Sequence, residues 1–336
     1  MGWTGVAVCP MALGTMQFGW TASHVTAFEI LDAYRAAGGN LIDTADMYGG
    51  NQSVESYEHN RAFVGLSEEI VGRWLASRHS RDDVLLVSKV RARVWDGPDG
   101  EGLHKRHILR AIDETLRRLR TDHIDVYLAH WPDPDAPIEE MMEAFGEVIA
   151  AGKARFMGTS NFCNWEGFGN LLKQAIDLGR MDAHFPRVAV EEPRFNLMNR
   201  GEYEGALQAL TLREELGIIC WSPLAGGFLS GKFRRDVAVP ENDRNSYILR
   251  TYANERGWAV VEALAGIAHR RKVPIASVAL AWLLSQAGVT AVIVGADCVQ
   301  QVADAAPAAT LDLGTNDLRL LTGVGWPSSE CEFVGW

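Results

Sequence analysis

Short apolar runs alternate along the chain with longer stretches in which apolar residues recur every three or four positions. Ile108, Ile112 and Leu119 follow this helical spacing, whereas the short runs have the length of strands. The predicted strands are residues 12–15, 41–44, 84–89, 124–130, 155–160, 188–191, 217–221 and 289–294. Gly152 and Gly179 stand where two of the intervening helices are predicted to end. Because a strand and a helix alternate about eight times, the sequence predicts a parallel sheet covered by helices.

Two α/β architectures fit this alternation: a closed (β/α)8 TIM barrel and a doubly wound open sheet. An open sheet that binds a dinucleotide carries G-x-G-x-x-G after its first strand, but residues 13–19 read LGTMQFG. The sequence therefore favours the (β/α)8 barrel. Because no Pro/Ser-rich linker divides the chain, we expect residues 1–336 to form a single domain. Three long loops, residues 49–65, 90–102 and 226–246, follow strands and so belong to the C-terminal face, where such barrels carry their chemistry.

Composition and charge narrow the class of protein. The 336 residues carry a formal net charge of −11 and are 47% hydrophobic, which suits a globular protein and argues against a nucleic-acid or anionic-membrane surface. No apolar run approaches the roughly 20 residues that cross a bilayer, and the N-terminus lacks the features of a secretory signal. The five cysteines are scattered and form no C-x-x-C pair, so we expect reduced thiols, a cytoplasmic protein and no metal site.

Polar residues that could do chemistry stand at the ends of predicted strands. Asp43 ends one strand and is followed five residues later by Tyr48, while Lys89 and His130 end the next two strands. Because a buried lysine requires an anionic partner, we expect Lys89 to pair with Asp43. The lysine would then stabilise the phenolate of Tyr48 and make it a usable general acid, and a neutral His130 could orient a carbonyl oxygen. A structural salt bridge with a core-edge histidine is the alternative, but four such residues at successive strand ends favour catalysis.

The chain resembles the aldo-keto reductase superfamily along essentially its whole length. The matching segments are residues 13–19 (LGTMQFG), 40–49 (NLIDTADMYG), 67–72 (SEEIVG), 86–89 (LVSK), 120–130 (RTDHIDVYLAH), 158–162 (GTSNF) and 221–224 (WSPL). The Asp…Tyr, Lys and His motifs occur in the family's order. The resemblance implies a (β/α)8 barrel that uses NADP(H) or NAD(H) to reduce an aldehyde or ketone, or to oxidise the alcohol.

The resemblance also implies roles for individual residues. Tyr48 would be the general acid/base, tuned by Lys89 and Asp43, and His130 would orient the carbonyl. The residues expected to bind the cofactor are Thr15, Met16, Asp43, Ser160, Asn161, Glu192, Trp221, Ser222, Leu224, Gly226, Lys232, Gly295, Asp297 and Gln301. Trp221 stands where an aromatic residue stacks on the nicotinamide ring in the family.

Within the expected cofactor site, Ser160 and Asn161 match the pair that hydrogen-bonds the nicotinamide carboxamide. Residues 222–226 match the turn that contacts the pyrophosphate, and residues 295–301 match the loop that holds the adenosine end. The match to the family begins only near Val8, so we expect its first hairpin strand to be truncated.

Two residues depart from the family pattern. Glu192 stands where a carboxamide-binding glutamine is usual, and a carboxylate can accept from the amide but cannot donate to it. Asp297 lies where relatives that prefer NADP(H) carry arginine or lysine for the 2′-phosphate. NADP(H) therefore remains the family default, NAD(H) is a serious alternative, and a cation from elsewhere, such as Lys232, could compensate.

The sequence does not identify the substrate, and it leaves more than one function open for the predicted barrel. We expect a small-molecule carbonyl or alcohol substrate, with Trp20 and Trp131 lining its pocket because both follow strand ends. These tryptophans and the polar loops fit a sugar or other polyhydroxy carbonyl, and equally a bulky aromatic ketone. The alternative functions are a cofactor-sensing regulatory subunit of the same fold with little turnover, and a barrel hydrolase or lyase.

Overall fold

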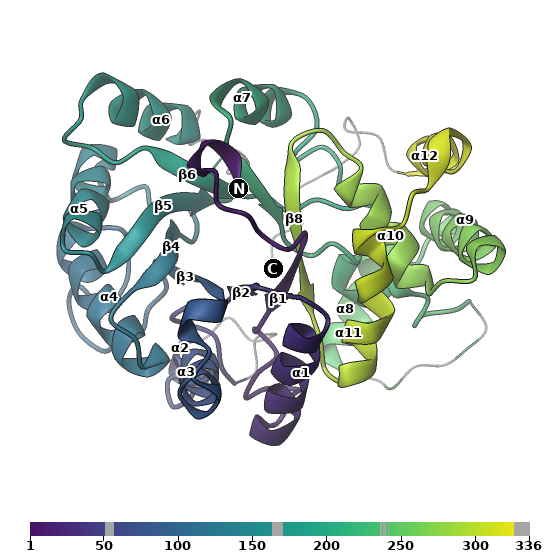
Figure 1. Cartoon of the computed structure of the whole chain (residues 1–336), viewed down its shortest axis with the longest axis horizontal. Helices are drawn as coiled ribbons and strands as arrows, with labels where there is room; N and C mark the ends of the chain where they lie inside the picture. The colour runs from purple at the N-terminus through teal and green to yellow at the C-terminus, as the bar shows by residue number, and fades with distance from the viewer. Residues whose placement is uncertain (51–56, 163–170, 236, 238–239, 241, 326–336) are drawn as a thin grey trace.

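The computed structural model describes the chain apart from residues 51–56, 163–170, 236, 238–239, 241 and 326–336. Eight parallel strands close into a barrel in which each strand pairs with the next in the chain and β8 pairs with β1 (Figure 1). The strands are β1 (Met11–Gly14), β2 (Leu41–Asp43), β3 (Leu85–Val90), β4 (Ile124–Ala129), β5 (Ala154–Ser160), β6 (Val188–Glu192), β7 (Gly217–Cys220) and β8 (Val289–Gly295). The predicted (β/α)8 barrel is confirmed, and each strand end lies within one residue of its predicted position.

Helices surround the barrel on its outer side (Figure 1). The α-helices are α1 (His24–Ala36), α2 (Tyr57–Asn60), α3 (Leu66–Arg78), α4 (Lys105–Leu119), α5 (Ile138–Ala150), α6 (Leu171–Met181), α7 (Ala206–Glu214), α8 (Asp243–Tyr252), α9 (Glu255–Arg271), α10 (Ile275–Leu284), α11 (Val299–Ala305) and α12 (Gly314–Val324). Short 3-10 helices are η1 (Gly2–Thr4), η2 (Arg81–Asp83), η3 (Ala225–Ser230) and η4 (Ala306–Ala309). Helices α8 and α9 come between β7 and α10, and α12 packs against α9.

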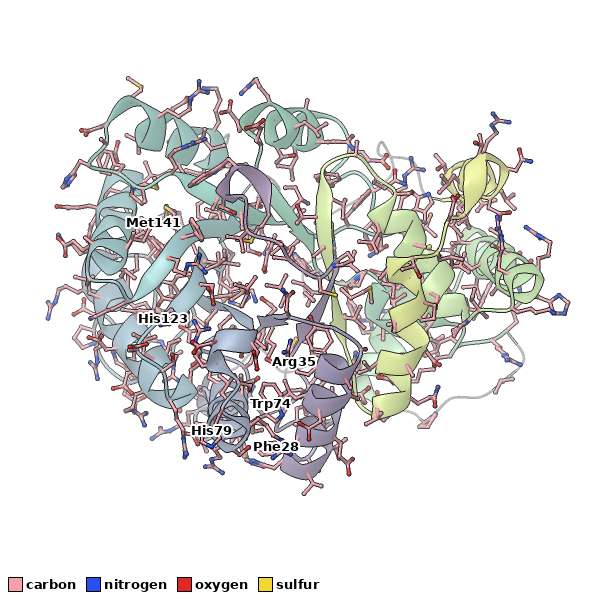
Figure 2. The ribbon with its side chains drawn as sticks, in the orientation of Figure 1. Phe28, Arg35, Trp74, His79, His123 and Met141 are labelled. Carbon is pink, nitrogen blue, oxygen red and sulfur yellow. The ribbon has the colours of Figure 1, made fainter. Side chains whose placement is uncertain are left out.

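The strands are buried on both faces, which explains their nearly continuous apolar sequences. Side chains that alternate along the strands fill the inside of the barrel, among them Val87 on β3 and Leu128 on β4. Outside the barrel, Trp74 on α3 is buried and donates its indole N–H to Asp32 on α1 at 2.8 Å. Figure 2 shows Trp74 and Phe28 where these two helices adjoin.

The N-terminal segment closes one end of the barrel. In place of a hairpin strand, it forms the 3-10 helix η1. Trp3 donates its backbone N–H to Glu215 O at 2.7 Å and its indole N–H to Val188 O at 2.9 Å. Both acceptors lie where a strand begins, so the segment covers the N-terminal ends of β6 and β7, and Figure 1 draws it beside β6.

The long loops lie at the opposite end, after the C-terminal ends of the strands. The 49–65 loop contains α2, and the 226–246 loop contains most of η3 and the start of α8. Arg61 Nη2 lies 3.7 Å from an Asp96 carboxylate oxygen, so the 49–65 and 90–102 loops are in contact.

One predicted helix end is wrong. Gly152 follows α5 with a left-handed backbone (φ 73°), as the prediction requires. Gly179 instead lies inside α6, where a Cβ would come within 2.4 Å of Pro186 O. Close approach of a neighbouring segment therefore requires glycine at this position.

The described residues were also considered for membrane-spanning helices, metal ligands and free thiols. No described helix combines the length and the apolar character needed to cross a lipid bilayer. The same residues contain no group of three or more His, Cys, Asp or Glu side chains that could hold a metal ion. Cys9, Cys220 and Cys298 carry free thiols, while Cys163 and Cys331 lie outside the described part of the chain.

Candidate active site

The buried pair of Lys89 and Asp43 forms the centre of the candidate site. Asp43 is the last residue of β2 and Lys89 the penultimate residue of β3, and their side chains are only 4% and 3% exposed. Lys89 Nζ donates to the Asp43 carboxylate and to Thr44 O, the latter at 2.9 Å. Nζ also lies 5.3 Å from the centre of the Tyr48 ring. The structure therefore brings Asp43, Lys89 and Tyr48 together, with the ion pair that the sequence predicts.

Glu192 adds a second carboxylate to this centre. It ends β6, is fully buried, and its Oε2 lies 3.6 Å from Lys89 Nζ. Neither carboxylate oxygen of Glu192 has a hydrogen-bond partner among the described residues. The sequence predicts a cofactor contact for Glu192, and its proximity to Lys89 was not predicted. A signal was present, because Val190 and Glu192 are alternate residues of one strand and Val190 faces the barrel interior.

One lysine between two buried carboxylates sets the protonation of the centre. Burial raises the pKa of Glu192 well above its usual range, and the Asp43 carboxylate raises it further. Burial lowers the pKa of Lys89, but Asp43 and Glu192 outweigh that effect and raise it overall. Lys89 is therefore a permanent cation that balances one carboxylate, while the second carboxyl group retains its proton to unusually high pH.

The expected activation of Tyr48 needs a correction. Lys89 does act to lower the pKa of the phenol, as predicted, but burial raises it by more, and Asp43 and Glu192 raise it further. The net shift is upward because the phenol is enclosed and the lysine charge is largely balanced. Tyr48 therefore carries its proton at neutral pH, in the form of a proton donor.

His130 follows β4 and faces Tyr48 edge-on, with ring centres 5.8 Å apart. Burial, together with the charges of Lys89 and Arg91, lowers the pKa of His130 well below its ordinary value. Its Nδ1 is buried and has no hydrogen-bond partner among the described residues. A neutral imidazole with an unused ring nitrogen thus lies beside the phenol.

Three residues predicted to bind the nicotinamide join neighbouring strand ends. Trp221 donates its indole N–H to Asn161 Oδ1 at 3.0 Å, and Asn161 Nδ2 donates to His130 O at 3.2 Å. Ser160 Oγ donates to Glu192 O at 2.9 Å. Asn161 has a left-handed backbone (φ 62°), which turns its side chain back across the ends of the strands. Trp221 and Asn161 are thereby held next to the catalytic candidates.

The residues predicted for the adenosine end lie in the loop after β8. Asp297 donates its backbone N–H to Gln301 Oε1 at 2.7 Å, and its carboxylate accepts from the Thr21 hydroxyl. A Cβ on Gly295 would come within 2.6 Å of Gln17 Oε1. The loop after β1 therefore packs against the loop after β8. Thr21 and Gln17 belong to this region, although they were not predicted from the sequence.

The two tryptophans predicted for the substrate pocket lie in different surroundings. Arg244, at the start of α8, lies over the Trp20 ring at 5.6 Å, and Trp20 adjoins the residue that hydrogen-bonds Asp297. Trp131 packs on His130, with ring centres 4.7 Å apart, and Arg91 lies 5.0 Å from its ring centre. Trp131 is thus tied to the catalytic candidates and Trp20 to the adenosine end. Neither arginine was predicted from the sequence.

The remaining predicted cofactor residues lie in the turns after β1 and β7. Thr15 donates from both N and Oγ1 to Asp43 O, at 3.0 and 2.9 Å, and Met16 beside it is half-buried. Ser222 O accepts from Asn196 Nδ2 at 2.8 Å in the turn that leads through Leu224 and Gly226 into η3. Lys232 is exposed and lies 5.5 Å from the ring centre of Phe233, its neighbour in the chain.

Comparison with known proteins agrees with this geometry. A sequence model of the Aldo/keto reductase family matches residues 10–324. The uncharacterized oxidoreductase YrpG of Bacillus subtilis (strain 168) is 33% identical over 330 residues, which cover 96% of this chain and 94% of that protein. Protein tas of Escherichia coli (strain K12) is 30% identical over 323 residues, 89% of each chain. A probable voltage-gated potassium channel subunit beta of Oryza sativa subsp. japonica is 31% identical over 316 residues, 90% of this chain and 88% of that protein. The chain therefore belongs to the aldo/keto reductase family and is an oxidoreductase by family.

Proposed function

We propose that the protein catalyses the NAD(P)(H)-dependent reduction of an aldehyde or ketone, or the reverse oxidation of the alcohol. The observation that supports this most directly is the convergence of four side chains at the C-terminal ends of β2, β3 and β4. The phenol of Tyr48 lies 5.3 Å from a buried ammonium group and 5.8 Å from a neutral imidazole, by ring centres. This arrangement provides a proton donor and a carbonyl-orienting group at one point.

In the proposed mechanism, Tyr48 delivers its proton to the carbonyl oxygen and takes it back in the reverse reaction. Lys89 stays charged and offsets the charge that develops on the phenol oxygen, held in place by Asp43. His130, neutral at working pH, donates a hydrogen bond that orients the carbonyl oxygen. A bound nicotinamide would supply or accept the hydride.

The residues around this centre fit a nicotinamide dinucleotide. The oxygens of Glu192 and Nδ1 of His130 are buried polar atoms without a hydrogen-bond partner among the described residues, and a bound cofactor or substrate could supply one. We propose that Glu192, Asn161 and Ser160 hold the carboxamide and that Trp221 packs on the nicotinamide ring. Asp297 favours NAD(H) at the adenosine end, while Arg244, which lies over the Trp20 ring, is a basic candidate for a 2′-phosphate beside the exposed Lys232.

A second candidate function is a cofactor-sensing regulatory subunit with little turnover. It is favoured by the 31% identity to a protein named as a probable potassium channel β-subunit. The complete set of Asp43, Tyr48, Lys89 and His130 favours the enzyme instead. In either role we expect a small-molecule carbonyl or alcohol ligand and a cytoplasmic protein.

Parallel tryptophan-fluorescence titrations with NADPH and NADH, followed by turnover of a carbonyl panel, test the proposal. We expect cofactor binding to quench Trp221 and Tyr48→Phe to lower kcat/KM by about 10²- to 10⁴-fold with cofactor affinity retained. Tyr127→Phe is the matched control, because the Tyr127 hydroxyl is buried on β4 and has no hydrogen-bond partner among the described residues. Full turnover by Tyr48→Phe would refute the proposed mechanism. Cofactor binding without turnover in the wild type would favour the regulatory subunit.

A further inference from the structure

Arg91 extends the line of side chains that leads into the candidate site. Val87, Lys89 and Arg91 are alternate residues, with Val87 in the barrel interior and Lys89 at the catalytic centre. Strand β3 ends at Val90, so Arg91 is the first residue beyond it, on the side where the strand leads out of the barrel. Its backbone is fixed there by a 2.8 Å hydrogen bond from Gly102 N to Arg91 O.

The guanidinium of Arg91 has hydrogen-bond donors that no described residue uses. A guanidinium carries five N–H donors, yet Nε of Arg91 is buried without a partner, and the nearest carboxylate contact is 3.9 Å from Nη2 to Asp133 Oδ1. The Asp133 oxygens also accept from two backbone N–H groups, Leu103 N at 2.7 Å and Asp135 N at 3.2 Å, which hold the carboxylate in place. Arg118, by contrast, donates to Glu68 at 2.6 Å. Arg91 is therefore a partly buried cation in one long ion pair with Asp133, and its Nε keeps a donor that no described residue uses.

The neighbours of Arg91 are the residues expected to meet the substrate. Its guanidinium carbon lies 5.0 Å from the centre of the Trp131 ring, and Trp131 packs on His130 at 4.7 Å. Its side chain is 22% exposed, which leaves it accessible to a ligand. The charge of Arg91 also contributes to the lowered pKa of His130, so it acts at short range on the imidazole.

We propose that Arg91 binds an oxyanion on the substrate, a carboxylate or a phosphate, several ångströms from the carbonyl that reacts. The inference rests on the proposed function and narrows its substrate class to anionic aldehydes and ketones. A guanidinium pairs with either oxyanion through two parallel N–H···O bonds, and the Trp131 face fits the apolar chain between the two groups. Lys89 cannot take this role, because Asp43 and Glu192 already surround it.

Matched substrate pairs test the inference. The carboxylate arm compares 4-oxobutanoate with butanal, and the phosphate arm compares glyceraldehyde 3-phosphate with glyceraldehyde. We expect the wild type to have a higher kcat/KM for the anionic member of at least one pair. The pair that shows this preference identifies the oxyanion as a carboxylate or a phosphate. Arg91→Met should reduce that preference by about 10- to 100-fold, chiefly through KM, and Arg91→Lys should restore part of it. The preference should also shrink as NaCl is added.

Arg93→Gln is the matched control, because Arg93 lies two residues on, is paired with Glu101, and should leave the preference unchanged. Absence of an anionic preference in both arms, or an equal loss for both members of a pair in Arg91→Met, would overturn the inference. Failure of the proposed function is distinguishable, since neither member would then be turned over. In that case, tryptophan quenching by 4-hydroxybutanoate and butan-1-ol, with and without cofactor, still tests the anion site through Trp131.

Discussion

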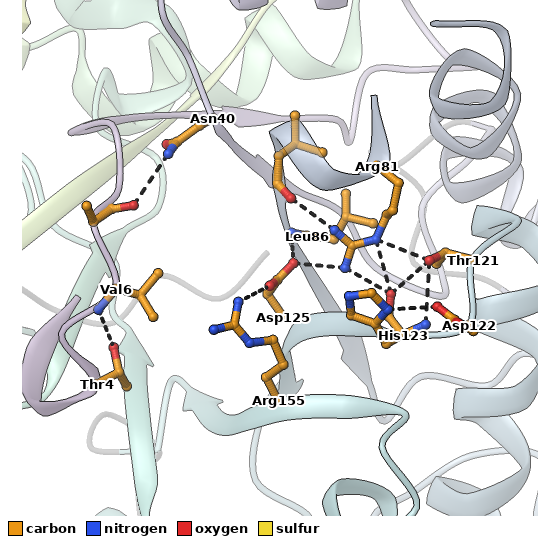
Figure 3. Close-up of polar contacts among 12 residues, drawn as sticks. Thr4, Val6, Asn40, Arg81, Leu86, Thr121, Asp122, His123, Asp125 and Arg155 are labelled. Atoms are coloured by element: carbon orange, nitrogen blue, oxygen red, sulfur yellow. Dashed lines mark hydrogen bonds and ion pairs between the residues drawn. The ribbon is translucent and has the colours of Figure 1, made fainter. Parts of the chain in front are cut away.

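Asp125 and Glu192 are both buried carboxylates on barrel strands, at opposite ends of the barrel. Asp125, near the start of β4, accepts from Leu86 N and Arg81 Nη2 through Oδ2, both at 3.0 Å, and from Arg155 Nη1 through Oδ1 at 2.8 Å (Figure 3). Glu192, at the end of β6, has no hydrogen-bond partner for either oxygen among the described residues. The N-terminal end of the barrel thus surrounds its carboxylate with hydrogen-bond donors, whereas Glu192 at the C-terminal end lies 3.6 Å from the Lys89 ammonium and accepts no hydrogen bond from a described residue.

The difference in hydrogen bonding between Asp125 and Glu192 distinguishes a residue that stabilises the fold from one that serves function. A buried carboxylate with a full set of donors stabilises the structure, whereas an unpartnered one destabilises it and persists where a ligand or a reaction uses it. In parallel barrels the C-terminal ends of the strands carry the chemistry and the N-terminal ends carry stability. Glu192 and Asp125 follow that division, and substitutions at the two ends should have opposite effects.

The largest effect is expected at the stable end. Asp125→Ala removes the acceptor for two arginines and a backbone N–H, so the free energy of unfolding should fall by about 3 kcal/mol, while kcat/KM per folded molecule stays unchanged. Urea unfolding and turnover of the same samples measure both quantities. Asp122→Ala is the control, because the Asp122 side chain is 95% exposed and, within the described part of the chain, pairs with its neighbour His123. Lost turnover without lost stability would break the division between the two ends.

A smaller effect of opposite sign is expected for Glu192→Gln. The unfolded glutamate loses its proton near pH 4, but burial and Asp43 raise the pKa of Glu192 in the folded protein, so the folded state binds more protons above that pH. The wild type should therefore lose stability as pH rises from about 5 to 8, and Glu192→Gln should lack this contribution and be more stable at pH 8 by about 1–2 kcal/mol.

Urea unfolding of both proteins across that pH range measures the difference. Glu69→Gln is the control, because Glu69 is exposed and pairs with Arg73 on the surface of α3. If the free energy of unfolding changed with pH in the same way for the wild type and Glu192→Gln, Glu192 would ionise normally. That result would remove the contrast with Asp125.

The sequence predicted the barrel and the catalytic candidates because both depend on local pattern. Strand positions follow from the apolar runs, and Asp43, Lys89 and His130 are polar residues where those runs stop. The approach of Glu192 to Lys89 depends on packing across the barrel interior, between strands that are not neighbours. The direction in which the pKa of Tyr48 shifts depends on how fully the phenol is enclosed. The position of Arg244 over Trp20 depends on a contact between distant loops. For Glu192 the residue spacing indicates only which way the side chain faces, and the other two features are not encoded in residue spacing.

The smallest effect is expected at the adenosine end of the predicted cofactor site. This region belongs to the functional face, yet the polar groups of Asp297 have hydrogen-bond partners. The Asp297 carboxylate accepts from Thr21 and its backbone is held by Gln301, so Asp297 is positioned to act by charge. Asp297→Asn should raise the affinity for NADPH relative to NADH by up to about tenfold at low ionic strength, and less at 0.3 M NaCl, because the charge is open to screening. Tryptophan titrations with both cofactors measure the ratio, with Asp304→Asn on α11 as the control for loss of one nearby charge. A ratio that stays unchanged at low salt would place the choice of cofactor with Arg244 instead, and Arg244→Gln should then weaken NADPH binding alone.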